Sequence, residues 1–380
     1  AGLSAAGLDP VIITRYPSGL RVALVTDAWL PQINGVTTTL SRCCDEMAQR
    51  GHEVLVISPN VFSTVRCPRY PEIRLAAHPI SKVGRLLAGF RPDAIHIATE
   101  GPLGVAARLY CGRWRLPFTT AFHTKFAEYL KVYAGIPAQW TYTLLRWFHD
   151  RAQRTLVPTA SMKNELEKRG FSDLVRWSRG VDTDLFRPRD ERFFDLPRPI
   201  FISVGRVAEE KNLRAFLDLD LPGSKVVVGD GTARQALEAC YPDVLWAGFK
   251  RGEDLARHYA GADVFVFPSR TDTYGLVMLE AGASGLPGAA YPVTGPIDVV
   301  QPNVTGILDD DLGNACRNAL SLDPVACRDW AASQSWGRCA ETLLANLAII
   351  DYATASSGLR SASSSAPHEA SGSSSVRGPM

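Results

Sequence analysis

The sequence lacks the cysteine patterns of a disulfide scaffold or a zinc finger. Its 380 residues contain eight scattered cysteines, with no Cys-x-x-Cys pair and no histidine at zinc-finger spacing. Disulfide frameworks and structural zinc sites depend on such spacings. Neither a disulfide scaffold nor a zinc site is therefore expected.

Long apolar segments are also missing. Residues 1–20 contain Asp9, Pro10 and Arg15 but no apolar core of signal-peptide length, and no later run is apolar and long enough to span a bilayer. We expect a cytoplasmic protein, either free in the cytosol or peripheral on the inner face of the cytoplasmic membrane.

Glycine and proline show no periodic repeat. The chain has 31 glycines and 25 prolines, and 46% of its residues are hydrophobic. This composition excludes a collagen-like or wholly disordered chain. A globular chain of this length is expected to divide into two domains.

The whole chain has no strong excess of either charge, yet its two halves differ. The net charge of +2 combines +9 in residues 1–190 with −7 in residues 191–380. A basic half suits nucleic acid, anionic lipid headgroups or a phosphorylated acceptor. Solvated surface is the alternative, because the arginines are dispersed between apolar residues.

Short runs of β-branched residues alternate with helical segments in both halves. This order is typical of βα units on a parallel sheet, so we expect two doubly wound α/β domains in series. A helix is expected at Thr37–Arg50, ending at Gly51. The expected strands are Arg21–Thr26, Glu53–Ser58, Ala94–Ala98, Phe118–Phe122, Thr155–Pro158, Ile200–Val204, Lys225–Gly229, Val244–Ala247 and Val264–Phe267.

Changes in composition place the domain boundaries. Prolines in a mixed-charge segment indicate a linker, and ten serines among the last thirty residues indicate a disordered tail. The expected parts are an N-terminal extension (1–20), an N-terminal Rossmann-like domain (21–186), a linker (187–199), a C-terminal Rossmann-like domain (200–350) whose final helix packs back on the N-terminal domain, and the tail (351–380).

Two loops that follow strands could bind an anion, because ligands of open α/β sheets bind beyond the carboxyl ends of the strands. Gly35 precedes a helix and would let an anion approach its N-terminus, although a plain turn is the alternative. Arg206 and Lys211 follow the strand Ile200–Val204, and two such cations suit a diphosphate. Pairing with the two glutamates between them is the alternative.

A third loop carries carboxylates. Asp272 follows the strand Val264–Phe267, and Glu280 lies about one turn into a helix that begins near Gly275. Carboxylates accept hydrogen bonds from pairs of hydroxyls, which sugars and ribose offer, while the helix N–H groups at Gly275 and Leu276 suit a phosphate. The alternative, a carboxylate favoured by the helix dipole, accounts for Asp272 better than for Glu280.

Taken together, these segments resemble the retaining GT-B glycosyltransferases of family 4. The resemblance covers about residues 21–350 and includes the glycine-containing first loop, Gly205-Arg206-x4-Lys211, and the pattern acidic-x7-Glu from Asp272 to Glu280. Further similar segments are Val157-Pro-Thr-Ala-Ser161, Arg179-Gly-Val-Asp182 and Ala121-Phe-His123-Thr. Within the family, Thr271–Glu280 and Ala290–Pro296 are most similar to bacterial GDP-mannose-dependent α-mannosyltransferases and their glycolipid-forming relatives.

The resemblance implies four catalytic residues. Arg206 and Lys211 would hold the leaving diphosphate, and Asp272 would bind hydroxyls of the donor sugar. His123 would face that sugar from the other domain. Retention would proceed by attack on the face that the leaving group departs from, with the diphosphate helping to take the acceptor proton.

The resemblance also implies further contacts to the donor. Glu280 would bind the ribose hydroxyls, and Gly35 would let the first loop close over the phosphates. Gly275 and Leu276 would offer backbone N–H groups. Such a site stabilises a departing anion electrostatically and needs no nucleophile.

Three residues depart from the family pattern. Asp272 stands where glutamate is usual and is one methylene shorter, while Gly282 and Gly288 replace larger residues. Gly282 lies within the expected helix, where glycine costs about 1 kcal/mol relative to alanine. Lower donor affinity or stability would follow from these changes.

Two other motifs predict no chemistry. Gly229-Asp-Gly231 follows a strand, but Arg234 stands where a dinucleotide fingerprint needs its third glycine. Asp-x-Asp occurs at 182/184, 218/220 and 309/311, but with 24 aspartates chance alone gives about 1.5 such pairs, so the motif is weak evidence. We predict neither a nicotinamide enzyme nor a catalytic metal.

The segment Trp140–Arg154 mixes aromatic, aliphatic and arginine residues at helical spacing. It fits an interfacial helix on an anionic membrane surface, or a core-packed helix with one basic face. Together with the +9 half it favours a lipid-linked or membrane-borne acceptor.

The sequence therefore predicts a hexosyltransferase with two Rossmann-like domains facing each other across a cleft. Its donor would be a nucleotide sugar, GDP-mannose before others, and its acceptor a lipid or glycan. No cofactor and no nucleic-acid partner are expected. Three alternatives stay open: a UDP-sugar-dependent glycolipid glycosyltransferase, a sugar-nucleotide epimerase or hydrolase of the same architecture, and a non-catalytic sugar-nucleotide-binding module.

Overall fold

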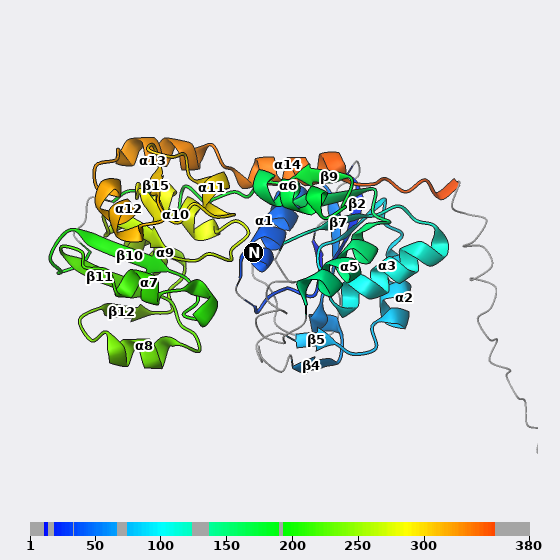
Figure 1. Cartoon of the computed structure of the whole chain (residues 1–380). Coiled ribbons are helices and arrows are strands. Elements are labelled where there is room, and N and C mark those ends of the chain that lie inside the picture. The colour runs from blue at the N-terminus through cyan, green and yellow to red at the C-terminus, as the bar shows by residue number, and fades with distance from the viewer. Residues whose placement is uncertain are drawn as a thin grey trace, which may run out of the picture.

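Two β-sheets, one in each half of the chain, form the framework of the protein. A computed structural model describes residues 11–13, 19–32, 34–66, 74–123, 137–189 and 193–353. The two halves lie side by side, and the chain crosses between them twice (Figure 1).

The N-terminal sheet has seven strands in the order β1-β3-β2-β6-β7-β8-β9. All neighbours run parallel except β1, which pairs antiparallel with β3. A separate antiparallel pair is formed by β4 and β5. The strands are β1 (Val11–Ile13), β2 (Arg21–Val25), β3 (Glu53–Ile57), β4 (Thr64–Arg66), β5 (Arg74–Ala76), β6 (Ala94–Ile97), β7 (Thr119–Ala121), β8 (Arg154–Val157) and β9 (Leu174–Arg176).

The C-terminal sheet has six parallel strands in the order β12-β11-β10-β13-β14-β15. The chain order reverses between β10 and β13, as it does between β2 and β6 in the other sheet. Such switch points leave a crevice at the carboxyl ends of the strands. The strands are β10 (Ile200–Val204), β11 (Ser224–Val228), β12 (Leu245–Gly248), β13 (Val264–Phe267), β14 (Gly288–Ala290) and β15 (Gly306–Leu308).

Helices connect the strands and cover both sheets. The N-terminal half contains α1 (Gly35–Gln49), α2 (Ile80–Phe90), α3 (Pro102–Trp114), α5 (Ala138–His149), α6 (Ala160–Lys168) and the 3₁₀ helix η1 (Pro59–Val61). The C-terminal half contains η2 (Glu209–Lys211), α7 (Arg214–Leu217), α8 (Arg234–Cys240), α9 (Gly252–Ala260), α10 (Leu276–Ala283), α11 (Pro296–Val299), α12 (Leu312–Ala319) and α13 (Pro324–Ala332), and it is followed by α14 (Trp336–Asn346). None of the helices in the described ranges is long and apolar enough to cross a membrane.

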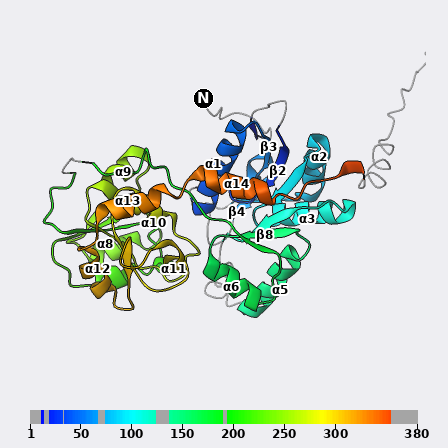
Figure 2. The same cartoon turned by 90° about the horizontal axis from the view of Figure 1, so that it is seen from above.

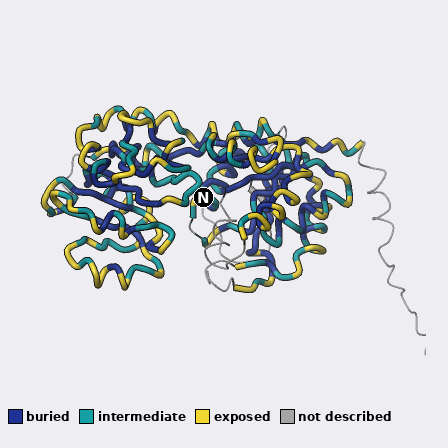
Figure 3. The backbone as a smooth tube through the Cα atoms, viewed as in Figure 1, coloured by how far each residue is buried: buried dark blue, intermediate teal, exposed yellow. Residues whose placement is uncertain are grey.

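Alternating residues of the central strands pack on opposite faces of each sheet. In β2, Ala23 and Val25 pack with α2 and α3, whereas Val22 and Leu24 pack with α1 and α14. In β10, Ile202 faces α9 and α10, and Phe201 faces α7 and α12. Both faces are therefore buried, which explains the near-continuous apolar runs of these strands (Figure 3).

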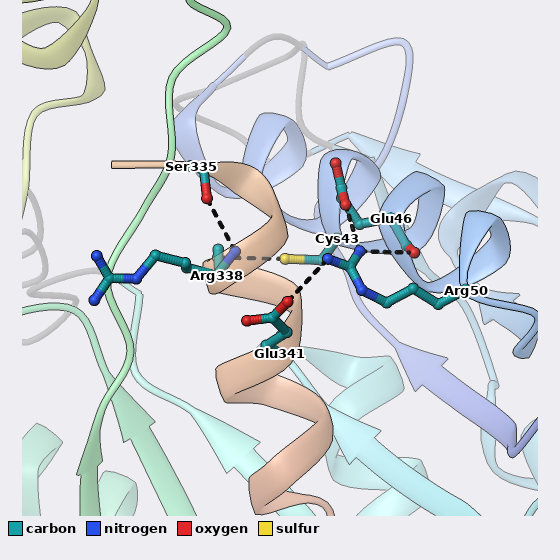
Figure 4. A network of polar contacts seen from close by, with 7 residues as sticks. Cys43, Glu46, Arg50, Ser335, Arg338 and Glu341 are labelled. Atoms are coloured by element: carbon teal, nitrogen blue, oxygen red, sulfur yellow. Dashed lines mark hydrogen bonds and ion pairs between the residues drawn. The ribbon is translucent and has the colours of Figure 1, made fainter. Parts of the chain in front are cut away.

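The helix α14 returns to the N-terminal half and packs on α1 (Figure 2). Cys339 of α14 lies 3.4 Å from Cys43 of α1 between their sulfur atoms, and its carbonyl accepts a hydrogen bond from Trp177 Nε1. At the surface, Arg50 of α1 bridges its neighbour Glu46 and Glu341 of α14 (Figure 4).

The two chain crossings lie next to each other. Trp177 belongs to the N-terminal core and Val181 to the C-terminal core, and the Val181 N–H donates to the carbonyl of Gln334 in the returning segment. A Cβ on Gly180 would lie 2.3 Å from the Trp336 nitrogen, so only glycine fits there. Val181 and Phe186, placed in the N-terminal domain from sequence, thus pack in the C-terminal core.

The structure matches every expected strand to within about two residues at its ends but adds others. Part of the expected N-terminal extension forms β1, and β4, β5, β9, β14 and β15 are not among the expected ranges. Of the expected tail 351–380, residues 351–353 are described, and the Tyr352 hydroxyl donates to the Pro92 carbonyl at 2.9 Å. The described chain thus continues past 350, and the rest of the expected tail lies outside the described residues.

Candidate active site

The loops after β10 and β13 lie together because these strands are neighbours at the switch point of the C-terminal sheet. The Asn212 side chain, at the end of the first loop, donates from Nδ2 to the Pro268 carbonyl of the second at 3.1 Å. Asn212 adopts a left-handed backbone (φ 53°), a conformation that asparagine tolerates.

An ion pair joins the two loops. Lys211 Nζ lies 2.6 Å from Asp272 Oδ1, and both side chains are mostly buried. The other carboxylate oxygen, Asp272 Oδ2, is buried and has no hydrogen-bond partner among the described residues. A bound molecule that donates a hydroxyl hydrogen would satisfy this oxygen.

Arg206 is more exposed than Lys211. Its guanidinium lies 4.0 Å from Glu210 Oε1, and 39% of its side-chain surface is accessible. Pairing with the intervening glutamates, the alternative considered from sequence, thus occurs at Arg206, whereas Lys211 pairs with Asp272. The two cations lie on the same loop with one of them accessible to an incoming anion.

The helix α10 begins beside this pair. Its N-cap Gly275 has φ 86°, and a Cβ there would lie 2.7 Å from Met278 Cε, so the position requires glycine. No side chain caps the helix, and Leu276 is its first residue. The N-terminal end of α10 therefore presents backbone N–H groups and the positive end of the helix dipole.

Glu280 lies in α10 with its carboxylate bonded to a tyrosine of α9. The Tyr259 hydroxyl donates to Glu280 Oε2 at 3.0 Å. Burial raises the pKa of Glu280 to about 7, and the Tyr259 hydrogen bond opposes this in part. The Glu280 carboxyl group therefore titrates near neutral pH.

Gly229 and Gly231 allow the loop after β11 to pack closely against the loop after β10. A Cβ on Gly229 would lie 1.8 Å from the Gly205 carbonyl oxygen, and one on Gly231 would lie 2.3 Å from that of Val207. The loop after β11 therefore lies directly against the loop after β10, which holds Arg206 in place.

His123 follows β7 in the N-terminal sheet and is buried. Arg179 NH2 lies 3.2 Å from His123 Nδ1, and since a guanidinium only donates, Nδ1 accepts and the ring proton is on Nε2. Burial, with the Arg179 charge, holds the pKa of His123 well below its usual value. Nε2 has no partner in the described chain, so a neutral imidazole offers one N–H to a ligand.

Two contacts join this histidine side to the donor-side loops. Thr273 Oγ1 donates to the His123 carbonyl at 2.8 Å, which places the residue after Asp272 against the N-terminal domain. A Cβ on Gly35 would lie 3.5 Å from Leu276 Cδ1, so the first residue of α1 adjoins the first residue of α10.

The structure thus brings His123 next to Thr273 and Gly35 next to Leu276 where the two domains meet. The contacts of Arg206 with Glu210 and of Glu280 with Tyr259 lie within the C-terminal half.

No role was expected from the sequence for Tyr259, Thr273 or Arg179. Arg179 lies in a segment quoted for its resemblance, and its guanidinium lies over the rings of Trp177 and Tyr274 at 4.6 and 5.9 Å. Nothing in the sequence singled out Tyr259, because a buried tyrosine on a helix face is indistinguishable from core.

Comparison with known families agrees with this architecture. The family model described as Glycosyltransferase Family 4 matches residues 33–185, and that of Glycosyl transferases group 1 matches residues 198–321. A GDP-mannose-dependent alpha-mannosyltransferase of Mycolicibacterium smegmatis is 35% identical over 327 residues, covering 78% of this chain and 86% of the relative. The Arabidopsis thaliana sulfoquinovosyl transferase is 29% identical and covers 79% of this chain and 65% of the relative.

Solved structures show the same fold. Anabaena HepE, in complex with UDP and glucose, superposes with a TM-score of 0.63 at 14% identity, covering 91% of this chain and all of that chain. The two Rossmann-like parallel sheets are those of the GT-B fold. With matches to both halves and a relative more than a third identical, the chain belongs to glycosyltransferase family 4 and is a hexosyltransferase.

Proposed function

We propose that the protein transfers a mannosyl group from GDP-mannose to a lipid-linked or glycan acceptor with retention of configuration. The observation that carries the proposal is the ion pair between Lys211 and Asp272 at the start of α10. It puts a cation for a diphosphate beside a carboxylate for a sugar hydroxyl. The names of the relatives support mannose from GDP-mannose as the donor group.

The donor would lie across the C-terminal sheet edge. Its diphosphate would bind Lys211, Arg206 and the N–H groups of Gly275 and Leu276, and its ribose hydroxyls would bind Glu280. As the bond between sugar and phosphate breaks, negative charge grows on the diphosphate, and these groups stabilise it where it forms. The diphosphate competes with Asp272 for Lys211 and leaves the carboxylate to the sugar.

His123 would face the sugar from the N-terminal domain. Its Nε2–H donates, and burial, together with the Arg179 charge, lowers the pKa of His123 and keeps the imidazole neutral. In retaining transfer the acceptor hydroxyl attacks from the face that the diphosphate leaves, and a phosphate oxygen takes the hydroxyl proton. The site then needs no protein nucleophile.

The acceptor would be carried by a membrane, and α5 would contact the anionic surface of that membrane. The inner face of α5 buries Tyr142, Leu145 and Phe148 in the core. The opposite face exposes Trp140 (74%), Leu144 (61%) and Trp147 (42%). Arg146 of α5 is exposed, as are Arg151 and Arg154, which follow the helix, with Asp150 as the acidic neighbour.

The buried face of α5 fits the core-packed interpretation, and the interfacial interpretation stays a prediction for the exposed face. Exposed tryptophan and leucine with a basic rim fit the interface of an anionic bilayer. This would place the protein on the inner face of the cytoplasmic membrane.

A donor screen tests the proposed activity. The protein is incubated with radiolabelled GDP-mannose, UDP-glucose and UDP-galactose, each with and without a lipid extract. We expect lipid-dependent release of GDP from GDP-mannose. Faster turnover of a UDP-sugar would assign the other donor, and turnover without acceptor would indicate an epimerase or hydrolase.

A further inference from the structure

A carboxylate of the C-terminal domain is bonded to the first turn of a helix in the N-terminal domain. Asp298 of α11 accepts a hydrogen bond from the Ser161 backbone N–H at 3.0 Å through Oδ1, and its Oδ2 accepts from the Ser161 hydroxyl. Ser161 is the second residue of α6. The helices α6 and α11 lie side by side in both views (Figures 1 and 2).

The helix α6 has no acidic residue of its own in its first turn. Its N-cap Thr159 accepts from the Met162 N–H at 3.2 Å and leaves the Ser161 N–H for another acceptor. A negative charge is favoured at a helix N-terminus, where backbone N–H groups and the helix dipole both attract it. Asp298 supplies that charge from the other domain.

The same turn of chain that leads to Asp298 also touches the donor loop. Gly295, the N-cap of α11, has φ 98°, and a Cβ there would lie 2.9 Å from the Asp272 carbonyl oxygen and 3.4 Å from that of Tyr274. The backbone of α11 therefore lies directly behind the loop that carries Asp272. On its other side this loop is bonded to His123 through Thr273.

We propose that Asp298 is a positioning residue that fastens the two domains together at the N-terminus of α6 and so holds the Asp272 loop against His123. Four links form one continuous path: Ser161 to Asp298, Asp298 through α11 to Gly295, Gly295 to the Asp272 loop, and Thr273 to His123. The bond to Ser161 fixes the angle between the domains. The Thr273 hydroxyl is then positioned to donate its hydrogen bond to the His123 carbonyl.

Amide hydrogen exchange of the whole protein without ligand tests the fastening. The Asp298→Ala variant removes the acceptor, so the exchange of the Ser161 amide should rise about tenfold or more. The Met162 amide, bonded to Thr159 within its own domain, should change less than about twofold. The matched control Asp310→Ala removes an exposed carboxylate of the same domain and should change neither amide.

Unchanged exchange at Ser161 in Asp298→Ala would overturn the proposal. Ser161→Ala tests the same contact from the N-terminal domain. It removes the hydroxyl that donates to Asp298 and keeps the backbone N–H. In the double variant the Ser161 amide should exchange no more than about twofold faster than in Asp298→Ala alone, since both changes remove the same contact. Additive effects of the two changes on this exchange rate would show that Asp298 acts through a contact other than that with Ser161.

Transfer kinetics test the positioning, and this part rests on the proposed function. Apart from the loop at Gly35, the groups assigned to GDP lie in the C-terminal half, so Asp298→Ala should leave GDP affinity within about twofold while kcat falls about tenfold or more. A kcat within about twofold of wild type would show that the contact does not position the loop. If the wild type transfers nothing from GDP-mannose, the proposed donor fails, and the exchange measurement still tests the fastening.

Discussion

Lys211 and Asp272 show how one contact can have two states. The Asp272 carboxylate neutralises Lys211 across 2.6 Å, which keeps a mostly buried cation paired. A diphosphate carries more negative charge than the carboxylate and would displace it. The residue pair would thus be ordered before the donor arrives, and it would change partners on binding.

Removing either cation should slow transfer strongly. Lys211→Ala and Arg206→Ala each delete a positive charge from the path of the leaving diphosphate, and loss of one such contact lowers turnover by about 10²–10³. Steady-state kinetics with GDP-mannose and a lipid acceptor give this value. Arg317→Ala, which removes an exposed cation of α12, is the control, and turnover within a few-fold in the site variants would remove those residues from the mechanism.

Glu280 should make GDP binding depend on pH. Its pKa of about 7 means that lowering the pH from 8 to 6 protonates the carboxylate, which then accepts fewer hydrogen bonds from ribose. GDP affinity should fall about tenfold over that range as measured by calorimetric titration. Glu280→Gln should bind GDP weakly and lose this dependence, while protonation of GDP itself affects both proteins equally.

The raised pKa of Glu280 also predicts that the stability of the fold changes with pH in the direction opposite to GDP affinity. The folded protein holds the Glu280 proton more tightly than the unfolded chain, whose glutamates titrate near their usual value. The contribution to stability is present below the unfolded pKa and is lost as the pH rises through about 7. Glu280→Gln should therefore raise the melting temperature at pH 8, and an unchanged or lower value would contradict the raised pKa.

The sequence singled out charged residues that the structure places near one sheet edge, but it did not predict their contacts. Lys211, Asp272 and Glu280 stand at spacings after strands that place them at one sheet edge. Whether Lys211 would pair with Glu210 or Asp272 depends on how two loops pack, which spacing does not fix. Tyr259 was missed for the same reason, because it reaches Glu280 from a different helix.

At the scale of elements, α10 has one glycine at its N-cap and one within the helix, with opposite requirements. Gly275 has a positive φ and no room for a side chain, whereas a Cβ on Gly282 would make ordinary contacts at 3.5 Å with Ala331 and Cys327. Gly282→Ala should raise the free energy of unfolding by about 1 kcal/mol, since alanine favours the helix. Gly275→Ala should lower it, and denaturant titration separates the two.

A stability loss in Gly282→Ala would show that α10 and α13 pack too closely for a methyl group. The departure of Gly282 from the family pattern would then be a packing requirement. The predicted gain would instead mean that this glycine lowers stability without structural need.

The helix α5 makes a prediction about membranes. Replacing Arg146, Arg151 and Arg154 by glutamine removes the basic rim of the exposed Trp140 stripe, and each such charge contributes about 1 kcal/mol near an anionic surface. Sedimentation with anionic vesicles should fall, and wild-type binding should weaken with added salt. GDP affinity, which depends on the other domain, is the control.

Equal sedimentation of wild type and the triple variant would exclude α5 as the contact. No sedimentation of the wild type would favour a soluble acceptor. The excess of arginine in the N-terminal half would then be solvated surface.

Elements with strong local signals were predictable and short edge elements were not. The central strands β2, β10 and β13 are buried on both faces and therefore read as continuous apolar runs. β1 and β9 have three residues each at the edges of the sheet, where pairing with a neighbour defines the strand more than its composition does. Their existence follows from tertiary contacts.

At the scale of the whole molecule, the two domains are joined by contacts that lie far apart in sequence. The crossings at Gly180 and Gln334 lie side by side, and α14 returns to α1. The sequence indicated the boundary too late, since Val181 and Phe186 already pack in the C-terminal core. The prolines mark the boundary poorly here, because the chain already crosses at Gly180, ahead of them.

The whole site should work without a metal ion. Lys211, Arg206 and the N-terminus of α10 would supply the positive charge that a divalent cation supplies in other enzymes. Addition of EDTA should leave the transfer rate within about twofold. A sharp loss that Mn²⁺ or Mg²⁺ restores would show that these groups do not suffice.

The configuration of the product tests the central claim most directly. Wild-type protein and Lys211→Ala are incubated with GDP-α-mannose and a lipid extract, and the anomeric carbon of the isolated glycolipid is assigned by NMR. We predict an α-mannosyl product from the wild type and at least about 10²-fold less from Lys211→Ala. A β-linked product, or hydrolysis of GDP-mannose with no glycolipid formed, would contradict a retaining mannosyltransferase at this site.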